Sequence, residues 1–269
     1  MSSEDGGSGL VDQGAPHAPA RSDGPVGTAL AKRRALVIGA GGLGTPALMA
    51  LARAGIGRII AVDDDIVELS NLHRQLLYQE ADVGGDKLDA AARALEGLGF
   101  PQERFQAVRT RFLPDNALAL VGDADIVIEG ADNFATKFLA ADACRLAEKP
   151  IVHGAAIRWV GTAWFVAARG RPCYRCLFED LLPNEAAPNC ASAGVMGPVV
   201  GMMGALMADL ALRYLHGADP SGALYSYEGK RDLLRRVPVS ARASCALCGS
   251  DPTIHDTTES RYFAAECTA

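Results

Sequence analysis

The stretch Ala35-Leu-Val-Ile-Gly-Ala-Gly-Gly-Leu-Gly44 decides the fold of this 269-residue chain. An apolar run of strand length runs directly into a glycine-rich turn, and an Ala-rich helix is expected from about Thr45 to Ala54. A strand that feeds such a turn and helix presents backbone N–H groups that can bind a phosphate. The next apolar run ends at Asp63, about 20 residues on, where an acid would hold a ribose hydroxyl. The predicted nucleotide-binding residues of this stretch are Gly39, Gly41, Gly42, Gly44 and Asp63.

Strands and helices are expected to alternate as far as about Pro150. The expected strands are 35–38, 58–62, 105–110 and 125–128, and the clearest helices are 45–54 and 87–98. Such alternation requires right-handed crossovers and therefore predicts a Rossmann-like, doubly wound parallel sheet of the α/β class. Beyond Pro150 a mixed or antiparallel half should continue the sheet, with an apolar helix packed across it. The expected strands there are 151–155, 162–168, 224–227 and 233–237, and the helix is 197–215.

Composition divides the chain and limits its partners. Residues 1–30 have almost no large apolar side chains and are expected to be a disordered tail, followed by a domain over 31–250 and a C-terminal tail over 251–269. The net charge of −6 argues against a nucleic-acid or anionic-membrane partner. No apolar run is expected to be long enough to span a bilayer, because the closest, 193–208, contains Pro198 and is interrupted by Asp209. A cytoplasmic protein is therefore expected.

The segment that follows Asp63 favours a triphosphate over a dinucleotide. Ser70-Asn71-Leu-His-Arg74-Gln75 places a cation and two amides close behind the ribose acid, and Lys87 adds a second cation. A cleft that binds ATP needs such positive charge beyond its helix N–H groups, and a dinucleotide does not. In the run 63–65 a second carboxylate, at Asp65, can help to hold Mg²⁺, whereas Asp64 is expected in solvent. An NAD-dependent dehydrogenase remains an alternative, but it leaves Arg74 and Lys87 unexplained.

Another polar pair follows the expected strand 125–128. Asp132-Asn133 comes after the turn Glu129-Gly-Ala131, and open parallel sheets bind ligands beyond the carboxyl ends of their strands. An acid there can reach Mg²⁺ or the reacting phosphate. The alternative is an Asx turn that caps the next helix.

The cysteines suggest a metal site and a candidate nucleophile. Two C-x-x-C pairs are predicted to hold one Zn²⁺ in a closed, structural Zn–S₄ site, formed by Cys173, Cys176, Cys245 and Cys248. Cys190 lies in a small-residue loop before the apolar helix and is a candidate nucleophile, with an inert buried thiol as the alternative. Cys144, inside a helix, is expected to be inert, and His153 is expected to be a satisfied core residue rather than a base.

Taken together, these motifs resemble the ThiF/MoeB/HesA family of adenylyltransferases, which activate ubiquitin-like sulfur-carrier proteins. The resemblance covers roughly residues 31–250. It implies a reaction in which the C-terminal Gly-Gly carboxylate of a small β-grasp carrier attacks the α-phosphate of Mg·ATP. It further implies a nucleotide-binding half over 31–150, a carrier-binding and zinc half over 151–250, and a homodimer.

The resemblance also implies individual roles. Gly42 contacts the phosphates and Asp63 the ribose, while Asp132 handles Mg²⁺ and the reacting phosphate. The triphosphate is bound by Asn71, Arg74, Gln75 and Lys87. Cys190 matches a loop cysteine that in some members links covalently to the carrier. The four C-x-x-C cysteines match the zinc ligands of the family.

One feature departs from the family pattern. Close relatives carry an Arg-Tyr-x-Arg-Gln-type segment near the N-terminus, whose Arg reaches the ATP of the partner subunit. Residues 1–30 contain a single arginine, Arg21, and no such motif. Three explanations remain open: Arg21, Arg33 or Arg34 replaces the missing arginine, a different partner supplies its charge, or the activity is weakened. A non-catalytic scaffold and a natural-product enzyme with another acyl substrate therefore remain alternatives. The C-terminal rhodanese domain of some relatives is not expected here, so sulfur should come from a separate donor protein, for thiamin, molybdopterin or another product.

Overall fold

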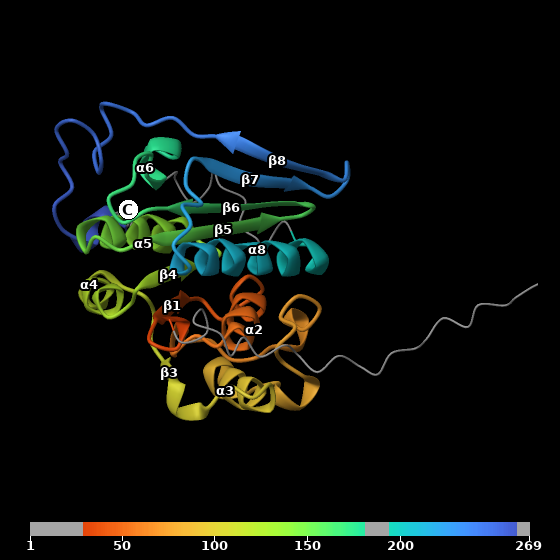
Figure 1. Cartoon of the computed structure of the whole chain (residues 1–269). Coiled ribbons are helices and arrows are strands. Elements are labelled where there is room, and N and C mark those ends of the chain that lie inside the picture. The colour runs from red at the N-terminus through yellow and green to blue at the C-terminus, as the bar shows by residue number, and fades with distance from the viewer. Residues whose placement is uncertain (1–28, 181–193, 263–269) are drawn as a thin grey trace, which may run out of the picture.

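The computed structural model describes residues 29–180 and 194–262, and there its strands form one eight-stranded sheet (Figure 1). The strands are β1 (Arg34–Ile38), β2 (Arg58–Val62), β3 (Phe105–Val108), β4 (Ile126–Glu129), β5 (Ile151–Ile157), β6 (Val160–Val166), β7 (Ala223–Glu228) and β8 (Leu233–Pro238). The main helices are α2 (Gly44–Ala54), α3 (Lys87–Gly97), α4 (Pro114–Gly122), α5 (Phe134–Leu146), α6 (Tyr174–Leu177) and α8 (Gly197–Leu215).

The sheet has the order β3-β2-β1-β4-β5-β6-β7-β8. The strands from β3 to β5 pair in parallel, and those from β5 to β8 pair antiparallel. This confirms the predicted parallel half and its antiparallel continuation. The chain leaves β1 toward β2 and β3 and then returns to β4 on the other side, so the strand order reverses between β1 and β4. Ligands of doubly wound sheets bind at this switch point, beyond the carboxyl ends of the strands.

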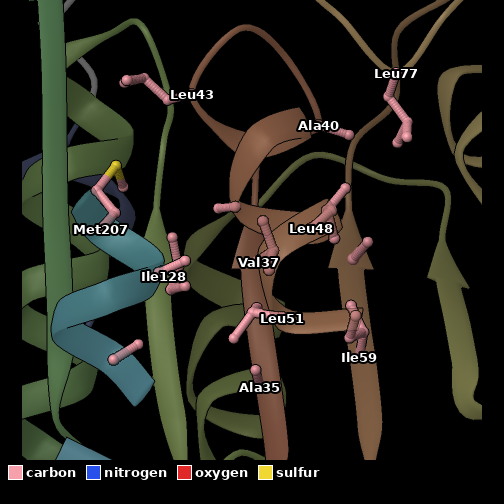
Figure 2. Packing of buried hydrophobic residues seen from close by; sticks show 14 of the residues in the cluster. Ala35, Val37, Ala40, Leu43, Leu48, Leu51, Ile59, Leu77, Ile128 and Met207 are labelled. Atoms are coloured by element: carbon pink, nitrogen blue, oxygen red, sulfur yellow. The ribbon is translucent and has the colours of Figure 1, made fainter. Parts of the chain in front are cut away.

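Two hydrophobic layers cover the sheet because strand residues alternate between its faces. On one face Val37 of β1 packs with Leu48 of α2 and Met207 of α8, as Figure 2 shows. On the other face Leu36 of β1 packs with Phe138 of α5, and α4 joins the same layer. Burial on both faces explains why the parallel strands read as continuous apolar runs.

Helix α8 corrects one expectation. By length and composition it could cross a membrane, since it has 19 residues and a mean hydropathy of 1.3, so the prediction that no run is long enough is wrong. In the fold it lies along β5 and β6 and beside α2 (Figure 1). Its close approach depends on Gly154 and Gly161, where any Cβ would overlap Met207 and Met203. The described structure therefore uses α8 as a core helix of the sheet.

The last described residue, Tyr262, contacts α5. Residues 251–262 belong to the segment expected as a C-terminal tail, yet Ile254 and Tyr262 are buried there. The Tyr262 hydroxyl donates a hydrogen bond to Asp142 of α5 over 2.8 Å. The expected tail of residues 1–30, apart from its last two residues, and Cys190 lie outside the described residues.

Candidate functional site

The glycine-rich loop between β1 and α2 is fixed by its own backbone. Gly39 has a φ of +86°, a conformation that favours glycine, and its N–H donates to the Val62 carbonyl oxygen over 2.9 Å. Gly44 opens α2 so close to this turn that a Cβ would overlap the carbonyl oxygen of Gly39. The buried Tyr78 hydroxyl donates to the Ala40 carbonyl over 2.7 Å. The loop therefore presents the N-terminus of α2 in a defined position.

Asp63 connects this loop to the end of β2. Its carboxylate accepts hydrogen bonds from the backbone N–H of Ala40 over 2.7 Å and of Asp65 over 2.9 Å. Burial raises the pKa of Asp63, although the positive charge of Lys87, 4.0 Å away, and the two backbone donors oppose this effect. The carboxylate is therefore held in place by the backbone of the glycine-rich loop and by its own turn.

Lys87 is the best-buried cation of the cleft. It is the first residue of α3, which Asp86 caps by accepting from the Asp89 N–H over 3.0 Å. Its side chain is only 5% exposed, and its Nζ lies 2.7 Å from an Asp65 carboxylate oxygen. The structure therefore holds the Lys87 charge against two acids of the 63–65 run.

Arg74 is held by the turn that carries it. Its guanidinium donates to the Asn71 side-chain oxygen and to the Ser70 carbonyl. The Asn71 amide nitrogen and the Ser70 hydroxyl both donate to Glu68, over 3.2 and 3.1 Å. Next to this turn Gln75 is buried, and its side-chain oxygen has no hydrogen-bond partner among the described residues. Such an acceptor is expected to find a donor in a ligand or water.

The loop after β4 places an acid at the carboxyl end of the sheet. Asp132 is exposed, and no side-chain hydrogen bond or ion pair joins it to any other described residue. Asn133, in contrast, caps α5 by accepting from the Thr136 N–H over 2.8 Å. The helix-capping alternative therefore describes Asn133, and the carboxylate of Asp132 is left available.

Beneath this loop lies a buried charged cluster that the sequence did not reveal. Glu129, the last residue of β4, is completely buried, and both its oxygens lie 3.0 Å from the Nζ of Lys137. His153 approaches the same carboxylate with its Nδ1 over 3.2 Å. Burial favours protonation of Glu129, but Lys137 and His153 outweigh it and lower its pKa. The pKa of His153 is lowered by burial, only partly offset by Glu129, so the neutral ring donates through Nδ1. His153 is buried as expected, but its Nε2 has no hydrogen-bond partner among the described residues, so the expectation of a satisfied core residue is wrong in that respect.

A single cavity of about 620 Å³ brings most of the predicted residues together. Its lining includes Gly39, Gly41, Gly42, Asp63, Asp65, Asn71, Arg74, Gln75, Lys87, Asp132 and Asn133. Gly44 and Ser70 do not line it: Gly44 fixes the glycine-rich loop, and Ser70 contacts Arg74 through its carbonyl and Glu68 through its hydroxyl. The lining also contains aromatic residues that the sequence analysis did not single out, among them Phe112, Trp164 and Tyr174. Nothing in their sequence pattern distinguished them from ordinary core residues.

The four predicted zinc ligands converge in a separate cluster. Their sulfur atoms all lie within 4.8 Å of one another, and all four residues are buried. The separations are 4.0 Å for Cys173–Cys176, 3.5 Å for Cys173–Cys245 and 3.4 Å for Cys176–Cys248. A tetrahedral Zn–S₄ site with Zn–S bonds of about 2.3 Å requires S···S separations of about 3.8 Å. The cluster therefore fits a structural zinc ion.

A second buried ion pair anchors the zinc cluster to α5. Arg175, which lies between two of the cysteines, donates to both oxygens of Asp142 over 2.8 Å, and both side chains are almost fully buried. Its guanidinium also lies 4.7 Å from the centre of the Phe138 ring. Cys144 is buried in the same helix, and burial raises the pKa of its thiol well above the usual range, which supports its interpretation as inert.

Arg33 and Arg34, two candidates to replace the missing N-terminal arginine, lie away from the cleft of their own chain. Arg33 precedes β1 and forms a 3.4 Å ion pair with Asp125, which precedes β4. Arg34 is the first residue of β1, whereas the glycine-rich loop follows the last. Both arginines are therefore at the opposite end of the sheet from the cavity. Arg21 lies outside the described residues.

Comparison with known proteins gives consistent matches. A model of the ThiF family matches residues 22–248. The sulfur carrier protein adenylyltransferase of Thermus thermophilus is 40% identical over 248 residues, which cover 89% of this chain and 91% of the relative. The SAMP-activating enzyme E1 of Haloferax volcanii is 38% identical over 222 residues, which cover 82% of each chain.

A longer relative and a solved structure extend the comparison. The adenylyltransferase and sulfurtransferase MOCS3 of Anopheles gambiae is 41% identical over 228 residues, which cover 84% of this chain and 52% of the relative. The chain thus spans about half the length of that protein. The crystal structure of Escherichia coli MccB with ATP superposes with a TM-score of 0.71 at 22% identity, covering 83% of this chain and 69% of MccB. At that identity the likeness concerns the fold alone.

Proposed function

Because the chain belongs to the ThiF family, we propose that it adenylates the C-terminal Gly-Gly carboxylate of a small ubiquitin-like sulfur-carrier protein. In this reaction a carboxylate oxygen attacks the α-phosphorus of ATP. A new C–O–P linkage forms, the bond between the α-phosphorus and its bridging oxygen breaks, and pyrophosphate leaves with the electron pair. The acyl-adenylate that results has a good leaving group, which a free carboxylate lacks.

The observation that carries this proposal is the content of the single cavity. Its lining combines the glycine-rich loop with both acids and cations, among them Asp63, the cations Arg74 and Lys87, and the carboxylate of Asp132, which has no partner among the described residues. The loop and the start of α2 provide N–H donors for phosphate, and Asp63 is placed to accept from a ribose hydroxyl. Arg74 and Lys87 supply charge that the leaving pyrophosphate requires. A dinucleotide carries fewer phosphate charges than ATP and does not require both of these cations.

The present partners of Arg74, unlike those of Lys87, leave its charge uncompensated. Lys87 is paired with acids at 2.7 and 4.0 Å, and Arg74 donates to neutral oxygens of its own turn. A triphosphate can replace those neutral oxygens at Arg74 with charged ones, which form stronger hydrogen bonds. We therefore assign Asn71, Arg74, Gln75 and Lys87 to the triphosphate.

Asp132 is the residue best placed to hold Mg²⁺. Both oxygens of Asp63 accept backbone hydrogen bonds and Asp65 is paired with Lys87, whereas Asp132 has no described partner. Mg²⁺ prefers carboxylate oxygens together with substrate phosphates, and when bound it would neutralise charge that develops on the phosphates. Asp132 would hold it, while Asp65 contributes by orienting Lys87.

The remaining assignments concern partners. The cysteine cluster would hold a structural Zn²⁺, which fits a reducing compartment such as the cytoplasm. Sulfur would be supplied to the activated carrier by a separate donor protein. A homodimer is also part of the proposal, and the exposed apolar side chains of Leu76 (61% exposed) and Met202 (38% exposed), both next to Gly201 of α8, are candidates for its interface.

The proposal is tested by carrier-dependent exchange of labelled pyrophosphate into ATP. The wild-type protein with Mg²⁺ and a carrier ending in Gly-Gly should show exchange, and a carrier without its two last glycines should not. Asp132→Asn should lower the exchange rate by about 100-fold, because it removes the charge without changing the size of the side chain. Cys190→Ala should leave exchange intact, since the thiol would act only after adenylation.

A matched control is Asp123→Asn, which alters an exposed acid close to the other end of β4. Its exchange rate should remain within about twofold of wild type, because surface charges far from a site have small effects. Protein that binds ATP but shows no exchange with any Gly-Gly carrier would contradict the proposed activity. Equal losses in Asp132→Asn and Asp123→Asn would remove Asp132 from the mechanism.

A further inference from the structure

The backbone just before Asp132 is tied to the buried charged cluster beneath it. The Ala131 N–H donates to the carboxylate of Glu129 over 2.7 Å. The same carboxylate accepts from Lys137, one helical turn into α5, and that lysine also donates to the Gly154 carbonyl of β5. One carboxylate therefore connects the end of β4, the Asp132 loop, α5 and β5.

We propose that Glu129, whose charge Lys137 balances, is a positioning residue that fixes the backbone of the Asp132 loop for phosphate chemistry. The inference rests on the proposed role of Asp132 and adds one residue that acts through it. Glu129 does not line the cavity, and the Lys137 Nζ, although Lys137 lines it, is occupied by Glu129 and Gly154.

The cost of the arrangement supports a specific role. Glu129 is 0% and Lys137 is 8% exposed in their side chains, and removing two charges from water at this depth is expensive. A well-packed apolar pair would often serve stability equally well. What an apolar pair could not do is accept the Ala131 N–H, which would remain without a partner in a half-buried loop. The hydrogen bond from the Ala131 N–H therefore explains why a carboxylate, and not an apolar side chain, is buried at position 129.

His153 also binds the Glu129 carboxylate, but it does not contact the oxygen that accepts from the Ala131 N–H. Its Nδ1–H donates to the second oxygen of Glu129, which leaves the oxygen facing Ala131 to the loop and Lys137. The His153 ring also lies 4.6 Å from the ring of Tyr174, which restricts its movement. The carboxylate therefore has donors on all sides and a fixed orientation.

Two double variants separate positioning from charge balance. Glu129→Gln with Lys137→Met keeps an oxygen for the Ala131 N–H, and its amide NH₂ faces His153, whose Nδ1 can accept once the ring proton moves to the unpartnered Nε2. Glu129→Met with Lys137→Met removes that oxygen. Both variants are uncharged at these positions and similar in volume, so they differ mainly in the hydrogen bond to the loop.

The Gln variant should keep the turnover number for carrier-dependent exchange within about threefold of wild type. The Met variant should lose about 30- to 100-fold, with the KM for ATP changed by less than about threefold, because small displacements of a reacting group mainly affect the chemical step. Hydrogen exchange of the Ala131 amide, measured by NMR, should be at least about tenfold faster in the Met variant than in the Gln variant.

Asp142→Asn provides a control for mere stability. It breaks the other buried ion pair of α5, with Arg175, far along the helix from Asp132. It should lower the midpoint of urea unfolding as much as the Met variant does, without changing turnover at temperatures where the protein is folded. Equal turnover of the Gln and Met variants, or an equal loss in Asp142→Asn, would overturn the inference.

The outcome remains informative if the wild-type protein shows no exchange with any carrier. That result would count against the proposed function. The Ala131 amide rates would then decide the inference alone, and equal protection in the two double variants would refute it.

Discussion

The nucleotide cleft and the four-cysteine cluster are both suited to charged ligands, but they balance their own charges differently. In the cleft the cations already have partners: Lys87 is paired with Asp65, and Arg74 donates to Asn71. In the cluster the four sulfurs face one another within 4.8 Å. Four thiolates at such distances repel one another strongly unless a cation lies between them. The cleft should therefore keep its shape without ATP, whereas the cluster should depend on its metal.

The largest expected effect is loss of the metal. Cys248→Ser should abolish zinc binding and with it the cooperative packing of α6 and residues 245–262, because binding of a structural zinc is worth about 10–16 kcal/mol in small domains. Typical stabilities are only about 5–15 kcal/mol. Thermal unfolding followed by circular dichroism, together with metal analysis, measures both effects.

Cys144→Ala is the matched control, because it removes another buried sulfur outside the cluster. It should cost about 1–2 kcal/mol, as expected for a small cavity. A Cys248→Ser protein that lacks zinc but unfolds at the wild-type temperature would show that the cluster, like the cleft, keeps its structure without a ligand.

The next effect concerns the backbone that shapes the cleft. Gly44→Ala should destabilise the protein by about 2–4 kcal/mol, since the added Cβ would overlap the Gly39 carbonyl oxygen and force the loop to move. Gly41→Ala should cost less than about 1 kcal/mol, because its Cβ would lie 3.6 Å from the Gln75 amide nitrogen. Urea unfolding of both variants gives the comparison, and equal stabilities would mean that the loop is not rigid.

A smaller effect, on the affinity for ATP, is expected when Lys87, the cation paired with Asp65, is replaced. Lys87→Met should raise the Kd for Mg·ATP by about 10- to 100-fold, because a charge-assisted hydrogen bond to phosphate is lost. Arg93→Met is the control in the same helix: Arg93 is 59% exposed and pairs with Asp82 outside the cavity. Isothermal titration calorimetry should find its Kd unchanged. A normal Kd in Lys87→Met would show that this ion pair serves the fold and not the nucleotide.

The smallest expected effect is a pH dependence of stability. The pKa of His153 is lowered in the folded protein, so below about pH 6.5 the unfolded chain takes up a proton that the folded chain does not. The free energy of unfolding should therefore fall as the pH drops from 6.5 to 5, by at most about 1.4 kcal/mol per pH unit from this residue. His153→Gln, which can still donate to Glu129 beside Lys137, should reduce the slope. An unchanged slope would assign the dependence to other groups.

The fold was predictable because its signals are local. Gly39 to Gly44 and Asp63 follow apolar runs at fixed spacing, and strand burial on both faces made those runs visible in the sequence. The ligand cysteines were equally clear from two short spacings. The range of α8 was predicted correctly, but its glycines and Pro198 were wrongly taken to make its apolar run too short for a bilayer, whereas Pro is tolerated in the first turn of a helix.

The buried ion pairs could not be predicted, because they depend on how separate elements of the fold pack together. Lys137 lies in an Ala-rich helix and resembles an ordinary surface lysine until α5 is packed against β5. Its partnership with Glu129 and Gly154 depends on the register of β4 with β5, and the contact of Tyr262 with Asp142 joins residues 120 positions apart. Such pairings are set by tertiary packing. No periodicity or spacing in the sequence encodes them.

The most direct test of the central claim is mass spectrometry of the carrier after incubation with this protein and Mg·ATP, with pyrophosphatase added to draw the reaction forward. The account predicts a carrier heavier by one AMP group, formed only with an intact Gly-Gly end, and lost on treatment with hydroxylamine, as an acyl-adenylate should be. An unmodified carrier in the presence of a protein that binds ATP normally would contradict it.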